Sequence, residues 1–135
     1  MLVADTSAWV EYLRRTGSPS HLALLAAVDD DTVILLEPVR AELLTGARSK
    51  HELAELRRLL EGFAVELVQP RDDFDAACDL YHRCRAVGIT PRGLIDCLIA
   101  AMALRAGHPL LHADRDLAAI AAVMGISEAP GSLAA

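Results

Sequence analysis

Short apolar runs alternate with longer segments of helical periodicity along the chain, and this alternation constrains the fold more than any other feature. The runs are Leu2-Val3-Ala4, Thr32 to Leu36, Ala64 to Val68 and Leu110-Leu111, and each is followed by a helical pattern. Strands joined through helices form crossover units whose strands are parallel. The sequence therefore predicts the α/β class, with a mainly parallel sheet covered by helices on both faces.

Start and stop signals bound the helices between these runs. Ser49 and Glu52 form a capping box ahead of the leucine-rich segment Leu53 to Leu60, and glycines follow several helical patterns. The expected helices are Ser7 to Arg15, one beginning at Pro19, Glu37 to Thr45, one after Ser49, Asp72 to Val87, Leu94 to Arg105, and one from Asp114 to Met124.

The length and composition predict one domain. The chain has 135 residues, of which 53% are hydrophobic, which is enough to bury a core without disulfides or structural metals. Small residues dominate the end of the chain, so we expect one domain over residues 1–127 and a flexible tail over residues 128–135.

The sequence favours a cytoplasmic protein. The longest mostly apolar stretch, Leu94 to Leu104, is interrupted by Asp96 and is too short to span a bilayer. The first residues lack the basic region and cleavage site of a secretory signal. The three cysteines form no CxxC pair and would leave one thiol over, which fits a reducing compartment.

The formal net charge of −6 argues against binding nucleic acid through the overall field of the protein. It does not exclude a nuclease, because metal-binding carboxylates contribute negative charge locally and a bound cation reverses the sign at the site.

Acidic residues interrupt the hydrophobic pattern at several positions. Asp5 ends the first strand, Glu42 and Asp96 lie within largely apolar helices, and Asp114 follows the last strand, with Asp116 two residues on. Taken singly, each has an ordinary explanation. Asp5 and Asp114 are good helix caps, Asp96 could cap its helix or pair with an arginine, and Glu42 could pair on the helix surface.

Together, these acids indicate a metal site. Two strand exits and the beginnings of two crossover helices can converge at the carboxyl edge of a parallel sheet, which would bring three or four carboxylates together. Such a cluster repels itself unless protons or a cation compensate. Oxygen ligands without histidine or thiolate favour Mg²⁺ or Mn²⁺, which suits phosphoryl chemistry.

Four motifs resemble the PIN-domain family, and the bacterial VapC toxins within it, from Leu2 to about Gly125. They are Val3-Ala4-Asp5-Thr6-Ser7-Ala8-Trp9, Pro38-Val39-Arg40-Ala41-Glu42-Leu43-Leu44-Thr45-Gly46, Leu94-Ile95-Asp96-Cys97-Leu98-Ile99-Ala100-Ala101 and His112-Ala113-Asp114-Arg115-Asp116-Leu117. Each motif is weak alone, but four in this order are specific.

The resemblance implies a three-layer α/β/α sandwich and a toxin endoribonuclease that hydrolyses RNA, with transfer or ribosomal RNA as expected targets. It implies Mg²⁺ or Mn²⁺ at Asp5, Glu42, Asp96 and Asp114, with Asp116 as a further catalytic acid and Thr6 or Ser7 as a supporting hydroxyl. It also implies a VapB-type antitoxin as partner and a homodimer, for which the segment Leu53 to Leu60 offers apolar surface.

Arginines near these acids are candidates for phosphate contacts. Arg92 precedes Asp96, and Arg115 lies between the two terminal acids; both could equally serve only to balance local charge.

Other classes of protein match the sequence less well than a PIN-domain nuclease does. A haloacid-dehalogenase-type phosphatase would carry a second aspartate two residues after the first, where this chain has Ser7. A receiver module needs a lysine late in the chain, and the lone lysine is Lys50. An inactive PIN domain used only for binding would be expected to have lost an acid, whereas all four are present.

Overall fold

The computed structural model describes residues 1–134, and its centre is one parallel sheet. The strands are β1 (Leu2–Ala4), β2 (Val33–Leu36), β3 (Ala64–Glu66) and β4 (Leu110–Leu111), in the order β3-β2-β1-β4. In register, Val3 faces Ile34 on one side and Leu110 on the other. The predicted parallel sheet is confirmed, and its strands are shorter than expected at β2 and β3.

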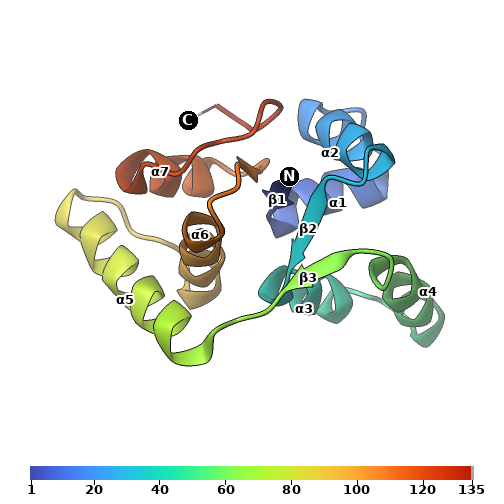
Figure 1. Cartoon of the computed structure of the whole chain (residues 1–135), viewed down its shortest axis with the longest axis horizontal. Helices are drawn as coiled ribbons and strands as arrows, with labels where there is room; N and C mark the ends of the chain where they lie inside the picture. The colour runs from blue at the N-terminus through green and yellow to red at the C-terminus, as the bar shows by residue number, and fades with distance from the viewer. Residues whose placement is uncertain (135) are drawn as a thin grey trace.

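Seven helices within residues 1–134 surround this sheet, which confirms the α/β class. Figure 1 shows α5, α6 and α7 gathered on one side of the sheet, and α1, α2 and α4 on the other. The helices are α1 (Thr6–Arg14), α2 (Pro19–Asp29), α3 (Glu37–Thr45), α4 (Lys50–Leu60), α5 (Pro70–Ala86), α6 (Leu94–Ala106) and α7 (Arg115–Met124). Each predicted helix is present, with ends that differ by at most two residues.

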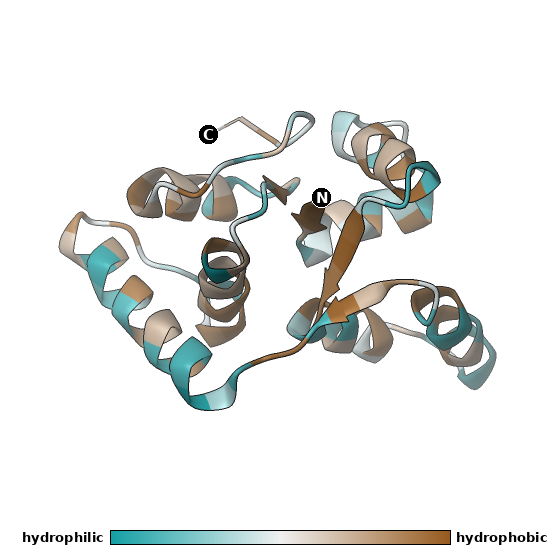
Figure 2. Cartoon of the chain, in the orientation of Figure 1, coloured by the Kyte–Doolittle hydropathy of each residue, from teal (hydrophilic) through white to brown (hydrophobic). Residues whose placement is uncertain are grey.

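The core lies between the sheet and these helices. In Figure 2 the strands are hydrophobic, whereas hydrophilic residues lie along α4 and α5. The middle of α6 from Cys97 to Ala103 is buried, as its apolar sequence indicates, and Trp9 packs edge-on against Tyr12 and Phe63. Among residues 1–134, no helix combines the length and apolar character required to traverse a membrane.

The strand order places a switch point beside β1. The chain proceeds from β1 to β2 and β3 in one direction, then returns to place β4 on the other side of β1. In open parallel sheets the crevice at such a point, beyond the carboxyl ends of the strands, is where ligands bind. The residues that follow β1 and β4 therefore border the position where a site is expected.

The segment after α7 runs beside β4. The Leu110 amide donates to the Ser127 carbonyl at 2.8 Å, and the Ala129 amide donates to the Leu110 carbonyl at 2.8 Å. The sequence predicts a flexible tail over residues 128–135, whereas residues 127–133 occupy the otherwise open edge of β4; Ala135 lies outside the described residues. An exposed strand edge leaves unpaired backbone groups, and this segment satisfies some of them.

Candidate active site

Asp5 stands directly after β1 and is 3% exposed. Its amide donates to the Leu111 carbonyl at 3.0 Å, which ties it to β4. Its carboxylate caps α1 by accepting the Ala8 amide at 3.1 Å, and the Ser7 hydroxyl lies 2.7 and 2.8 Å from its two oxygens. The Ser7 oxygen in turn accepts the Ala113 amide at 2.9 Å, so Ser7 joins the ends of β1 and β4.

Burial dominates the electrostatics of Asp5. It raises the pKa of this carboxyl from 3.8 to about 6, although hydrogen bonds from Ser7 and the Ala8 amide act in the opposite direction. A carboxylate with so little solvent, and with no arginine or lysine partner among residues 1–134, is costly to keep charged. A helix cap alone would work equally well at the surface, so capping does not explain why this acid is buried.

Asp114 also combines a cap with a second contact. One carboxylate oxygen accepts the Asp116 amide at 2.8 Å and caps α7, while the other pairs with Arg92. The capping interpretation from sequence is therefore correct for both Asp5 and Asp114. The cap uses Oδ1 alone and leaves Oδ2 for the contact with Arg92.

Asp96 and Glu42 come from the two crossover helices. The pKa of Asp96 is raised, first by burial and then by the nearby carboxylates of Asp114 and Glu42, while Arg92 lowers it. Glu42 lies on α3 and accepts a hydrogen bond from the Thr6 hydroxyl at 2.5 Å. The mutual repulsion indicates that acids from α3, α6 and the end of β4 share one region, and Thr6 links that region to α1.

Arg92 supplies the positive charge in this region. Its guanidinium pairs with Asp114, lies 3.3 Å from Asp96 and lies 3.0 Å from Asp116. The arginine partner considered for Asp96 in the sequence is therefore real, and the same side chain serves three acids. Arg115 is exposed and forms no ion pair with the described residues.

The acidic and hydroxyl side chains of this region are suitable ligands for a divalent metal, but with Arg92 between them they are not placed to share one ion. The donors are carboxylate and hydroxyl oxygens, which suit Mg²⁺ or Mn²⁺. Within residues 1–134, no three acidic, histidine or cysteine side chains are placed to ligate one ion. Because a guanidinium already occupies the space between three carboxylates, an ion shared by Asp96 and Asp114 requires Arg92 to move away.

His112 was not identified from the sequence as a functional residue. It follows β4 in the sequence, and its side chain is fully buried. Its Nε2 lies 2.5 Å from a Glu128 oxygen, and its Nδ1 accepts a hydrogen bond from the Asp114 amide at 3.3 Å. A histidine after a strand is not distinctive by itself. The sequence feature that could have singled out His112 is its position two residues before Asp114.

Known proteins share both the sequence and the fold of this chain. The PIN domain family matches residues 2–123. The VapC ribonuclease Mb1587 of Mycobacterium bovis and Ribonuclease VapC11 of Mycobacterium tuberculosis are each 37% identical over 131 residues, covering 96% of this chain and 98% of theirs. The chain belongs to the PIN-domain family, among the VapC ribonucleases.

A solved structure supports the fold of this PIN domain independently of close sequence similarity. A toxin-antitoxin complex from Klebsiella pneumoniae matches with a TM-score of 0.65 at 18% identity, covering 84% of this chain and 87% of that one. The acids at the switch point are thus set in a PIN fold. The phosphatase and receiver alternatives are not favoured by these matches.

Proposed function

We propose that this PIN domain is the toxin of a toxin-antitoxin pair, a cytoplasmic endoribonuclease that hydrolyses transfer or ribosomal RNA with Mg²⁺ or Mn²⁺. The observation that supports it best is the convergence of Asp96, Asp114 and Asp116 on a single guanidinium, with the Glu42 carboxylate close enough to raise the pKa of Asp96. Negative charge concentrated at a switch point suits a cation that bridges protein and phosphate.

Each residue has a distinct task in this proposal. Asp5, Glu42, Asp96 and Asp114 hold the metal, and Asp116 is a further acid at the rim. A divalent ion held by these residues would supply polarisation of a phosphodiester and a lower pKa for a bound water. Ser7 orients Asp5 through its hydrogen bond, and Thr6 orients Glu42 in the same way.

Arg92 is proposed to exchange partners when substrate binds. In the metal-free arrangement its guanidinium offsets part of the charge of three acids, and its side chain is 58% exposed, so it can rotate outward. A guanidinium at the rim can take two oxygens of an RNA phosphate. Arg115, exposed on the first turn of α7, offers a second cation for the same strand.

The test is incubation of the purified protein with total RNA, with Mn²⁺ or Mg²⁺, with EDTA, and with no addition, followed by mapping of the cut ends. The proposal expects cuts at a few sites that require the added ion and disappear with EDTA. Cleavage that persists in EDTA, or that proceeds at the wild-type rate with an Asp96→Asn preparation, contradicts it.

A hollow beside Glu42 suits the antitoxin. Its apolar lining is Val10 and Leu13 of α1, Leu43 of α3 and Leu56 of α4, and its polar lining is Thr6, Arg14, Glu42, Arg48 and Glu52. We propose that an antitoxin segment with an apolar face occupies it and extends an arginine or lysine to the acids. Such a cation would compete with metal, as Arg92 does within the chain.

Co-purification with the product of the neighbouring gene tests this partner. The complex is expected to lack ribonuclease activity. Leu56→Glu is expected to restore that activity by weakening antitoxin binding, and Leu22→Glu, at an exposed position on α2, is the control. Full activity of an intact complex would refute this view of inhibition.

A homodimer remains part of the proposal. On α4, Leu60 is fully buried and Leu53 and Leu56 are half-buried, whereas Leu59 is 41% exposed and offers apolar surface outside the hollow. Leu67, Phe74 and Leu104 are 62%, 39% and 44% exposed. Phe74 and Leu104 follow and precede the ion-paired Asp73 and Arg105 in sequence, and the Leu67 carbonyl accepts from Arg105 at 3.2 Å; we propose this area as a second candidate dimer contact beside α4. Light scattering that shows a monomer at micromolar concentration would count against it.

A further inference from the structure

The C-terminal segment is connected to the proposed site through two side chains. Glu128 accepts a hydrogen bond from His112 at 2.5 Å, and His112 accepts the Asp114 amide at 3.3 Å. His112 is fully buried, whereas the Glu128 side chain is 36% exposed. A chain of two hydrogen bonds therefore runs from the segment after α7 to the backbone of an acid in the site.

These contacts determine which ring nitrogen of His112 carries the proton. Nδ1 faces an amide N–H, so it must offer a lone pair. Nε2 faces a carboxylate, so it must carry the hydrogen. Glu128 thereby selects the tautomer that can hold the Asp114 amide, in the way that carboxylates beyond metal-ligating residues orient them.

The segment itself is anchored at several further points. The Leu133 amide donates to the His112 carbonyl at 3.0 Å, and the Ser132 hydroxyl lies 3.2 Å from both the His112 amide and the Leu110 carbonyl. Gly131 has φ +100° and lies so close to α2 that a Cβ there would be 2.8 Å from the Ala23 Cβ. Neither that backbone conformation nor that approach is compatible with a larger residue.

We propose that Glu128 and His112 are positioning residues, and that the segment of residues 127–133 thereby belongs to the working site and is not a dispensable tail. The pair acts through Asp114, whose backbone it fixes at the start of α7. The inference rests on the proposed ribonuclease function, but it also predicts a bond and a tautomer that can be observed without RNA.

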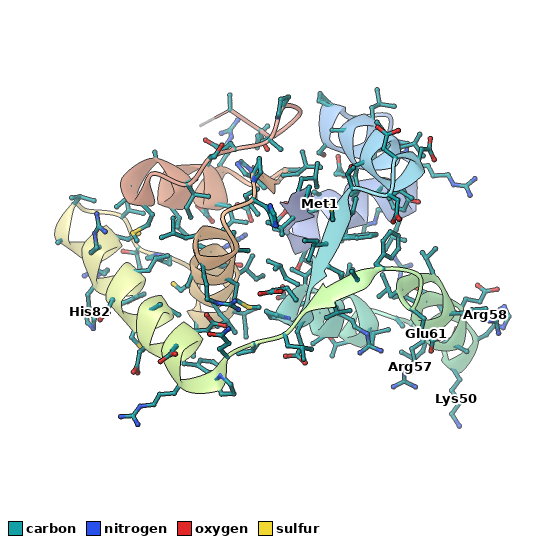
Figure 3. The ribbon with its side chains drawn as sticks, in the orientation of Figure 1. Met1, Lys50, Arg57, Arg58, Glu61 and His82 are labelled. Atoms are coloured by element: carbon teal, nitrogen blue, oxygen red, sulfur yellow. The ribbon has the colours of Figure 1, made fainter. Side chains whose placement is uncertain are left out.

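The first test measures the tautomer. Nitrogen-15 spectra of the metal-free protein are expected to show His112 with a protonated Nε2 and a bare Nδ1, and Glu128→Ala is expected to shift the Asp114 amide signal. Glu61→Ala is the control, because it removes the same charge from an exposed residue at the end of α4. Figure 3 shows Glu61 beside Arg57 and Arg58, away from the C-terminal segment. A proton on Nδ1 would overturn the proposal.

The second test measures metal binding and turnover. Glu128→Ala is expected to weaken Mn²⁺ binding and to lower kcat about tenfold with little change in KM, which is the usual scale for loss of an outer-shell partner. Glu128→Gln keeps an acceptor for Nε2 and should restore most of both. Gly131→Ala should displace the segment that carries Glu128 while both residues of the pair keep their side chains. Its Mn²⁺ affinity and kcat should therefore resemble those of Glu128→Ala.

The outcomes separate this inference from the ribonuclease proposal. If wild-type protein binds Mn²⁺ but cuts no RNA, the proposed function fails while the effect of Glu128→Ala on Mn²⁺ affinity still tests the pair. If Glu128→Ala and Glu61→Ala bind Mn²⁺ equally and turn over RNA equally, the segment has no part in the site. A lower Tm of Glu128→Ala with unchanged kcat and Mn²⁺ affinity would show a purely structural role, and would also refute the proposal.

Discussion

Replacing Asp5 with asparagine is expected to stabilise the metal-free protein while abolishing its metal response. The pKa of Asp5 is about 6 in the folded chain, against 3.8 for an ordinary aspartate. The folded state therefore binds this proton more tightly, so stability decreases as pH rises through that window, and the loss is complete above it. At neutral pH the difference corresponds to roughly 3 kcal/mol.

The asparagine side chain would remove most of that cost and keep the principal hydrogen bonds. Its amide oxygen can still accept the Ala8 amide and the Ser7 hydroxyl. A gain of about 1 to 3 kcal/mol is expected, or roughly 3 to 10 °C in Tm for a chain of this size. The gain should shrink near about pH 4.5, where wild-type Asp5 is protonated.

Thermal melts in EDTA and in Mn²⁺, at neutral and acidic pH, measure both effects. Wild type should gain Tm with Mn²⁺, whereas Asp5→Asn should not. The exposed Asp79→Asn on α5 is the control for loss of one charge. If Asp5→Asn melts several degrees below wild type in EDTA and keeps its Mn²⁺ response, Asp5 is a structural cap and not a ligand.

Three other changes probe the surroundings of the site. Arg92→Gln should lower the Tm of the metal-free protein and tighten Mn²⁺ binding, because the acids lose their internal cation. Calorimetry that gives Arg92→Gln and wild type the same Mn²⁺ affinity would contradict this, and Arg115→Gln is the control. Thr6→Val should reduce kcat more than Thr6→Ser does, because only serine keeps the hydrogen bond to Glu42, and equal rates for the two would be inconsistent with that role. Arg105→Met should cost about 3 kcal/mol because Asp73 stays buried without its cation and keeps only the Gln69 amide as a partner, and RNA cleavage should be retained at low temperature. Because Arg105 lowers the pKa of Asp73, this contribution is present above the ordinary aspartate range and is lost as pH falls below it, so urea melts of wild type and variant should converge in acid.

The sequence predicted the elements well because its local signals agree with the fold. Ser49 caps α4 by accepting the Glu52 amide, and Gly107 and Gly125 end α6 and α7 in the left-handed conformation, as expected. The apolar stretch around Asp96 forms the most buried helix. Alternation of strand and helix was enough to predict parallel pairing, because few other connections are possible.

The candidate site was predicted in outline but not in its contacts. Sequence placed Asp5 and Asp114 at strand exits, and the neighbouring positions of β1 and β4 bring those exits together. It could not show that Arg92 serves three acids, because that depends on how the loop before α6 packs against the start of α7. Glu128 escaped notice because a single acid among small residues carries no periodic signal; its role arises from pairing with a strand.

Single-turnover RNA cleavage with Mn²⁺, measured for Asp96→Asn and for wild type, shows whether these acids form the catalytic centre. Asp96 is partly buried among like charges, and its neutral replacement keeps the shape of the side chain. We expect Asp96→Asn to fold, to melt no lower than wild type without metal, and to cut RNA at the wild-type sites at least about a hundredfold more slowly. Cleavage at the wild-type rate and sites by the folded variant would contradict the claim that these acids form the catalytic centre.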